Sequence, residues 1–136
     1  MTSRAMWKLL VLGIIGATGC GESVEPTKRV PEPAVLSVRL SVPVARNDSG
    51  IVFSIAGPTR VRGTSTAGML LFQRDGLNLT TRFAVVGPLS SGATLLTFPV
   101  SDVRSAGAYN AVIEAVTGSD GQLRALPDGY AITIEP

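Results

Sequence analysis

Seven carboxylates are the side chains of this sequence whose chemistry could support catalysis. Two acids on opposite sides of a glycosidic bond are sufficient for glycoside hydrolysis, because one protonates the leaving group and the other acts as nucleophile or base. Six of the seven lie in expected turns or at a strand end, where such residues are common, and Glu114 is expected on the solvent face of a strand. The seven are Asp48, Asp75, Asp102, Glu114, Asp120, Asp128 and Glu135. We therefore expect no catalytic residues and keep a small carboxylate-dependent hydrolase as an alternative.

Other common catalytic and metal-binding side chains are scarce. The 136 residues contain no histidine and one cysteine, Cys20. The composition excludes Ser-His-Asp and Cys-His catalysis, and zinc or iron sites with histidine ligands. The segments "NDSG" and "GSDG" offer oxygen ligands, but a calcium site needs about 6 to 8 converging oxygens. We expect turns at both places, and neither a metal nor a cofactor.

The single cysteine ends the most apolar run of the sequence. Arg4 and Lys8 form a positive start, "LLVLGIIG" forms an apolar centre, and small residues follow, which is the pattern of a secretory signal. An apolar run of about ten residues is too short for a membrane-spanning helix, which needs ~20. The sequence therefore predicts a signal peptide at residues 1–19.

The segment "ATGC", which ends at Cys20, resembles the lipobox of bacterial lipoproteins, with Ala17 where Leu is usual. The resemblance implies that Cys20 is lipidated on its sulfur, that the signal is cleaved before it, and that fatty acids of the palmitate type hold the protein in a membrane of the bacterial cell envelope. Gly21 stands where Asp would signal inner-membrane retention in enterobacteria-like sorting, so the outer membrane is favoured. The alternatives are an ordinary signal cleaved near Ala17 and a buried free cysteine.

The charge balance changes when the signal is removed. Of the 12 Lys and Arg, Arg4 and Lys8 lie in the signal, which leaves ten against 10 Asp and Glu. A chain without net charge or a clustered basic face has no electrostatic attraction for nucleic acid. We expect the membrane as a partner through the lipid, a possible envelope protein, and no nucleic acid.

The remaining sequence divides into a tether and one domain. "GESVEPTKRVPEP" is rich in proline and charge, so residues 20–33 are expected to form the lipidated cysteine and an extended tether. From residue 34 to 136, apolar residues alternate with polar ones, which is typical of strands with one buried face. Short turns rich in Gly, Asp, Ser and Pro separate seven such segments. The apolar positions of the seven are 36–42, 51–55, 70–72, 83–85, 96–100, 109–113 and 130–134.

These segments predict an all-β fold, a single antiparallel β-sandwich of about seven strands. In "SAGAYNAVIEAV" the Ala and Glu content also permits a helix, but Val112, Ile113 and Val116 are β-branched, so a strand is favoured. The segments "GIVFSIAGP", "GATLLTFPVSD" and "GYAITIEP" resemble small bacterial envelope domains of the cohesin-like or immunoglobulin-like class. A true cohesin would be a receptor for a docking module on another protein.

A functional surface follows if successive strands reverse direction. The first, third and fifth connections then lie at one end of the sandwich, away from the membrane. This end would hold the candidate binding residues Arg46, Asn47, Asp48, Arg74, Asp75, Asp102 and Arg104. We expect a lipid-anchored, non-enzymatic interaction or structural module that contacts a protein partner through this rim. A ligand-binding lipoprotein is a further alternative.

Overall fold

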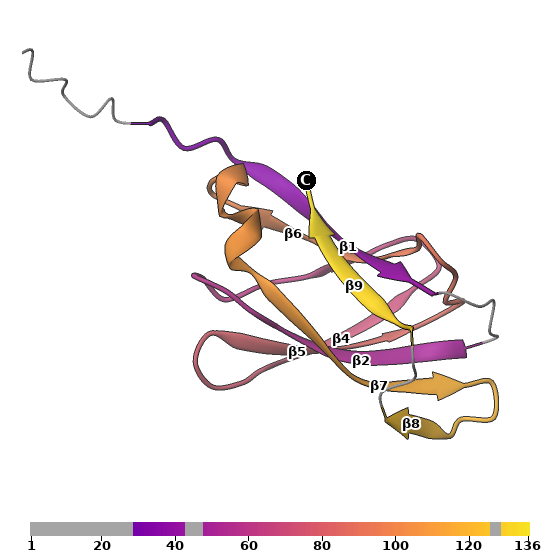
Figure 1. Ribbon diagram of the computed structural model, residues 1–136. Coiled ribbons are helices and arrows are strands. Elements are labelled where there is room, and N and C mark those ends of the chain that lie inside the picture. Colours follow the sequence, from indigo (N-terminus) through magenta and orange to yellow (C-terminus); the bar gives the residue numbers. More distant parts are fainter. Residues whose placement is uncertain (1–28, 43–47, 126–128) are drawn as a thin grey trace, which may run out of the picture.

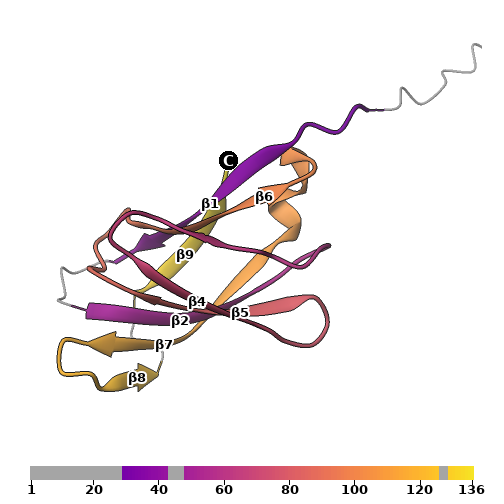
Figure 2. The ribbon, with the colours of Figure 1, turned by 180° about the vertical axis from the view of Figure 1, so that it is seen from behind.

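The computed structural model describes residues 29–42, 48–125 and 129–136, which form a sandwich of two antiparallel β-sheets (Figure 1). One sheet has four strands in the order β3-β6-β1-β9, and the other has five in the order β4-β5-β2-β7-β8. Figure 2 shows the same two layers from behind. The expected all-β sandwich is confirmed.

The strand bounds follow the chain from Ala34. The four-stranded sheet contains β1 (Ala34–Ser41), β3 (Thr64–Ser65), β6 (Thr94–Val100) and β9 (Ala131–Glu135). The five-stranded sheet contains β2 (Asp48–Ala56), β4 (Leu70–Asp75), β5 (Thr80–Val86), β7 (Asn110–Gly118) and β8 (Leu123–Ala125). A short 3-10 helix, η1 (Val103–Ala108), joins β6 to β7.

The core lies between the two sheets and is formed by alternate residues of the central strands. Leu36, Val38 and Leu40 of β1 are fully buried, as are the apolar positions of β2 and β5. Phe53 stacks on Phe83 with ring centroids 5.5 Å apart. Because side chains of a strand point alternately to opposite faces, this core is the direct product of the period-two pattern.

All seven expected strands are present, and β3, β8 and η1 are additions to them. "SAGAYNAVIEAV" is divided: its first residues belong to η1 and its later residues to β7. Phe72 belongs to the apolar positions 70–72, for which the sequence predicts a buried strand face, but it is 60% exposed. Both faces of β4 carry apolar residues. Leu71 packs against the core, and Phe72 points to the opposite face.

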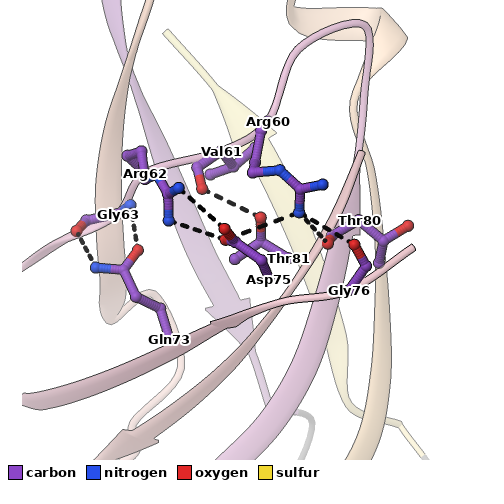
Figure 3. A network of polar contacts seen from close by, with 9 residues as sticks. All are labelled: Arg60, Val61, Arg62, Gly63, Gln73, Asp75, Gly76, Thr80 and Thr81. Carbon is purple, nitrogen blue, oxygen red and sulfur yellow. Dashed lines mark hydrogen bonds and ion pairs between the residues drawn. The ribbon is translucent and has the colours of Figure 1, made fainter. Parts of the chain in front are cut away.

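The connection between β2 and β4 decides where the loops lie. Residues 57–69 cross to the other sheet, form β3 there, and return, so that β4 runs parallel to β2 instead of reversing. Figure 3 shows the polar contacts that hold this segment against β4 and β5. Arg62 forms two hydrogen bonds to the carboxylate of Asp75, of 2.8 and 3.0 Å, and the side-chain amide of Gln73 pairs with both backbone groups of Gly63.

No helix among the described residues is long and apolar enough to cross a membrane.

Candidate interaction surface

The expected rim is not a single surface, because the chain does not reverse between β2 and β4. Asp102 and Arg104 lie at the tether end of the sandwich, where Arg104 donates a 3.0 Å hydrogen bond to the carbonyl of Val30. Asp75 lies at this end too, since Ala56 pairs with Thr80 there, whereas Asp48 lies at the far end. The placement of all these residues at one end is therefore wrong. Cys20, Arg46, Asn47 and Asp128 lie outside the described residues.

Arg74 and Asp75 do not share a surface either. They are neighbours in β4, so their side chains point to opposite faces of the sheet. Arg74 pairs in register with Arg82 on the outer face, and Asp75 turns inward to Arg62. A binding role for any residue of the rim stays a prediction.

Asp48 forms a buried polar cluster at the far end. Its side chain is 2% exposed and accepts hydrogen bonds from the guanidinium of Arg124 and the hydroxyl of Tyr130. These partners come from β8 and from the residue before β9, so the cluster joins strands of both sheets. Both oxygens of the carboxylate accept hydrogen bonds. Asp48 is therefore a structural tie, a residue whose contacts hold the two sheets together.

Asp102 is the N-cap of η1. Its carboxylate accepts from the backbone N–H of Arg104 at 3.0 Å and from the guanidinium of the same residue at 2.9 Å. The side-chain hydrogen bond to Arg104 is the main reason that the pKa of Asp102 is lowered, and it raises the pKa of Arg104. Val103 donates a 2.7 Å backbone hydrogen bond to Glu32, so η1 holds the end of the tether.

We expect the replacement of Asp102 by Asn to lower the free energy of unfolding at neutral pH and to make it less sensitive to acid. A carboxyl whose pKa is lowered by folding stabilises the fold above its unfolded value, and this contribution is lost as the pH falls from the ordinary value of 3.8 through the lowered one. Urea unfolding of both proteins between pH 7 and pH 2 measures the difference. A difference that stays constant over this range would contradict the assignment.

The other candidate carboxylates that the structure describes are also engaged in polar contacts. Among the described residues, Glu114 pairs with Arg82, Glu135 pairs with Arg39, and Asp120 accepts a 3.1 Å hydrogen bond from the backbone N–H of Gln122. No group of three or more His, Cys, Asp or Glu side chains in the described part of the chain is placed to hold a metal ion. No acidic residue is among the described residues that line the groove on the outer face of the five-stranded sheet.

The outer face of the five-stranded sheet is the most distinctive surface of the described domain. Strand pairing aligns two rows of residues across it, perpendicular to the strands. The first apolar row contains Leu70, Val86, Gly50, Thr117 and Leu123, and the second contains Phe72, Ala84, Val52 and Ala115. Four large side chains of these rows are exposed, from 44% for Val86 to 68% for Leu123, whereas Val52 is half-buried and Gly50 is buried. Exposed apolar residues gathered on one face of a domain mark interaction sites in soluble proteins.

A charged row borders the second apolar row on the tether side. The register aligns Arg74 of β4, Arg82 of β5, Ser54 of β2 and Val112 of β7, which is 55% exposed, and Glu114 lies beside this row at the bulge in β7. Glu114 accepts from Arg82 at 2.5 Å and from the hydroxyl of Ser54 at 2.6 Å. Glu114 thus lies on the outer face, as expected. An open groove of about 330 Å³ runs between the second apolar row and the charged row, with Phe72 and both arginines in its lining.

The outer face of the four-stranded sheet is different in chemistry. One transverse row there contains Thr64, Thr97, Ser37 and Glu135, and the next contains Thr94, Arg39 and Thr133. Arg39 and Glu135 form an ion pair of 2.7 Å across the two rows. Polar rows are what a sheet face in contact with water requires. This face also carries one exposed apolar pair, Val35 with Pro99, so the larger set of exposed apolar residues belongs to the five-stranded sheet.

Comparisons of the chain with protein-family models, with curated proteins and with solved structures return no match. The structure itself shows an all-β domain of two antiparallel sheets. The lipobox and the cohesin-like or immunoglobulin-like resemblance stay predictions.

The sequence contains one local signal of the apolar face. In "MLLF", residues 69–72, four apolar residues follow one another, so both faces of the strand are apolar where a strand with one wet face would alternate. The other members of the two rows come from four further strands. Only their register reveals that they lie side by side.

Proposed function

We propose that this chain is a lipid-anchored protein of the bacterial cell envelope whose β-sandwich is a non-enzymatic interaction module. The observation that carries the second part is the pair of apolar rows on the outer face of the five-stranded sheet. Phe72 and Leu70 expose 60% and 63% of their surface there, both on β4, whose other face packs Leu71 against the core. Folding alone gives no reason to place these side chains in water.

The anchor is supported by the sequence of residues 4–21. A positive start, an apolar centre and "ATGC" together favour lipidation of Cys20, and Gly21 favours the outer membrane. Several acyl chains are needed for stable anchoring, because each buried CH₂ contributes about 0.8 kcal/mol and one chain holds only marginally. The cohesin-like resemblance supports the same class of function, a receptor domain that binds another polypeptide.

Replacement of Cys20 by Ser tests the anchor in the full-length protein expressed in a bacterial host. The wild-type protein should enter the detergent phase on phase separation and incorporate labelled palmitate, because acyl chains partition with detergent. The variant should enter the aqueous phase and lose the label. Label that persists in the variant would exclude lipid attachment at this residue.

A photo-crosslinkable residue at position 72 tests the interaction module in the same cells. We expect adducts with a polypeptide from position 72. The matched control is position 133, because Thr133 is exposed on the opposite outer face of the sandwich. Equal adducts from both positions, or none from position 72, would contradict the proposal that the apolar face is the interaction site.

A further inference from the structure

We infer that the apolar face binds a second copy of this chain, with the two five-stranded sheets packed face to face about a two-fold axis that runs along β2. The inference rests on the proposed function and names the partner of that same surface. Three features of the described residues support it: the order of the rows, the distribution of charge within the charged row, and the end of the sandwich at which the chain enters.

The order of the rows selects the direction of the axis. A symmetric dimer uses the same patch on both copies. If the axis runs along the strands, each row stays at its own level, so the apolar rows of one copy meet the apolar rows of the other. An axis across the strands keeps β4 over β4 and β5 over β5, so the arginines of the two copies would face each other or the far end of the partner sheet, and not Glu114. Like charges that face each other are unfavourable, so the first direction is preferred.

The charged row is complementary to its own image about this axis. Its two arginines lie on β4 and β5, on one side of β2, and Glu114 lies on β7, on the other side. Rotation about β2 therefore places the second copy's β7, with Glu114, above β5 and Arg82, one strand away from Arg74 on β4. Arg74 faces Arg82 directly across the strands, which is unfavourable for two like charges. In the described part of the chain Arg82 is paired with Glu114 and Arg74 has no ion pair, so a second carboxylate would relieve this repulsion.

The position of the tether agrees with the same axis. The described chain enters beside η1, through hydrogen bonds from Arg104 to Val30 and from Val103 to Glu32. Figure 1 shows this entry point on the four-stranded layer, away from the apolar face. An axis along the strands keeps the entry points of both copies at one end of the dimer, so both can be anchored in one membrane.

The size of the face predicts a weak dimer that forms on the membrane. Five strands about 4.8 Å apart and some six residues long cover about 500 Å² per copy, or about 1,000 Å² in total, which is near the lower limit for a specific interface. Anchoring two copies in one membrane raises their effective concentration and compensates for a small contact area.

Cross-linking of the full-length protein in bacterial membranes tests the geometry. Val52 lies on β2 and would face its own image, so Val52→Cys should form dimers. Facing sheets lie about 10 Å apart, too far for a disulfide, which needs Cα atoms within about 7 Å. A short bifunctional maleimide is therefore the probe. The matched control is Ser37→Cys, at the equivalent central position of the four-stranded face. We expect about tenfold more cross-linked dimer from Val52→Cys than from the control. The two introduced cysteines have a high effective concentration only where they lie on faces that touch each other.

Charge variants in the Val52→Cys background test the complementarity. Arg74 is exposed, so Arg74→Glu should leave the fold intact and reduce the dimer yield several-fold, while Arg74→Lys should retain it. Equal yields from Val52→Cys and Ser37→Cys, or an Arg74→Glu variant that cross-links as well as the parent, would overturn the inference. If Val52→Cys gives no dimer while position 72 forms adducts with another protein, the self-association is wrong and the interaction module stands. If Val52→Cys gives no dimer and position 72 gives no adducts, both the self-association and the interaction module are wrong.

Discussion

Phe53→Ala is expected to lower the free energy of unfolding by about 3 to 5 kcal/mol, a large part of the roughly 5 to 15 kcal/mol that stabilises a domain. Phe53 is fully buried on the central strand of the five-stranded sheet and stacks on Phe83. Truncation removes this contact and leaves a cavity. The two sheets can close this cavity only in part, because hydrogen bonds between the strands of each sheet hold the strands in place. Urea unfolding followed by circular dichroism measures the change.

Phe72→Ala is the matched control, because the same side chain is removed from the opposite face of the same sheet. Phe72 is 60% exposed, so its loss should change the free energy of unfolding by less than about 0.5 kcal/mol. Ile132→Ala should fall between the two, since Ile132 is only partly buried at the edge of the four-stranded sheet. Equal effects of Phe53→Ala and Phe72→Ala would show that the assignment of faces is wrong.

Asp48→Ala is expected to destabilise the domain by about 2 to 3 kcal/mol, because hydrogen bonds to a buried charged group contribute more than neutral ones. The substitution removes the acceptor for both Arg124 and Tyr130 and disconnects β2 from β8 and from the start of β9. The value is below that for breaking a fully buried ion pair, since the side chain of Arg124 is 44% exposed and can be rehydrated.

Asp75→Ala provides the comparison for Asp48→Ala. Asp75 also pairs with an arginine, Arg62, but the side chains of this pair are 44% and 63% exposed. An exposed ion pair contributes at most about 1 kcal/mol. We expect Asp48→Ala to lower the midpoint of urea unfolding clearly more than Asp75→Ala. Similar midpoints for the two variants would show that Asp48 is not a structural tie.

The core could be predicted from the sequence because it depends on neighbouring residues. In "VLSVRLSV" the alternation of apolar and polar residues sets which side chains of β1 point inward, and the structure buries Leu36, Val38 and Leu40 accordingly. The same argument succeeds for β2, β5 and β6. It fails for β4, where "LLF" is apolar in both phases and the pattern contains no information about which face meets the core.

The ends of the sandwich could not be predicted in the same way. Among the seven expected strands, the assumption that successive strands reverse fails once, at residues 57–69, where the chain visits the other sheet and returns. That single crossing places Asp75 and Asp102 at the tether end and leaves Asp48 at the far end with Arg124, 76 residues away in the chain. Each local turn in this segment is compatible with either path, so the choice is made by long-range pairing.

The sequence by itself determined the seven longer strands of the described domain and the buried faces of those strands in which apolar and polar residues alternate. It also predicts the anchor. These are properties of residues within a few positions of one another. The tertiary structure alone decided which residues of different strands lie side by side. The apolar rows combine β2, β4, β5, β7 and β8, and the charged row joins Arg82 to a glutamate 32 residues later. Register between strands is set by the packing of the whole core, and no short segment of the chain contains that information.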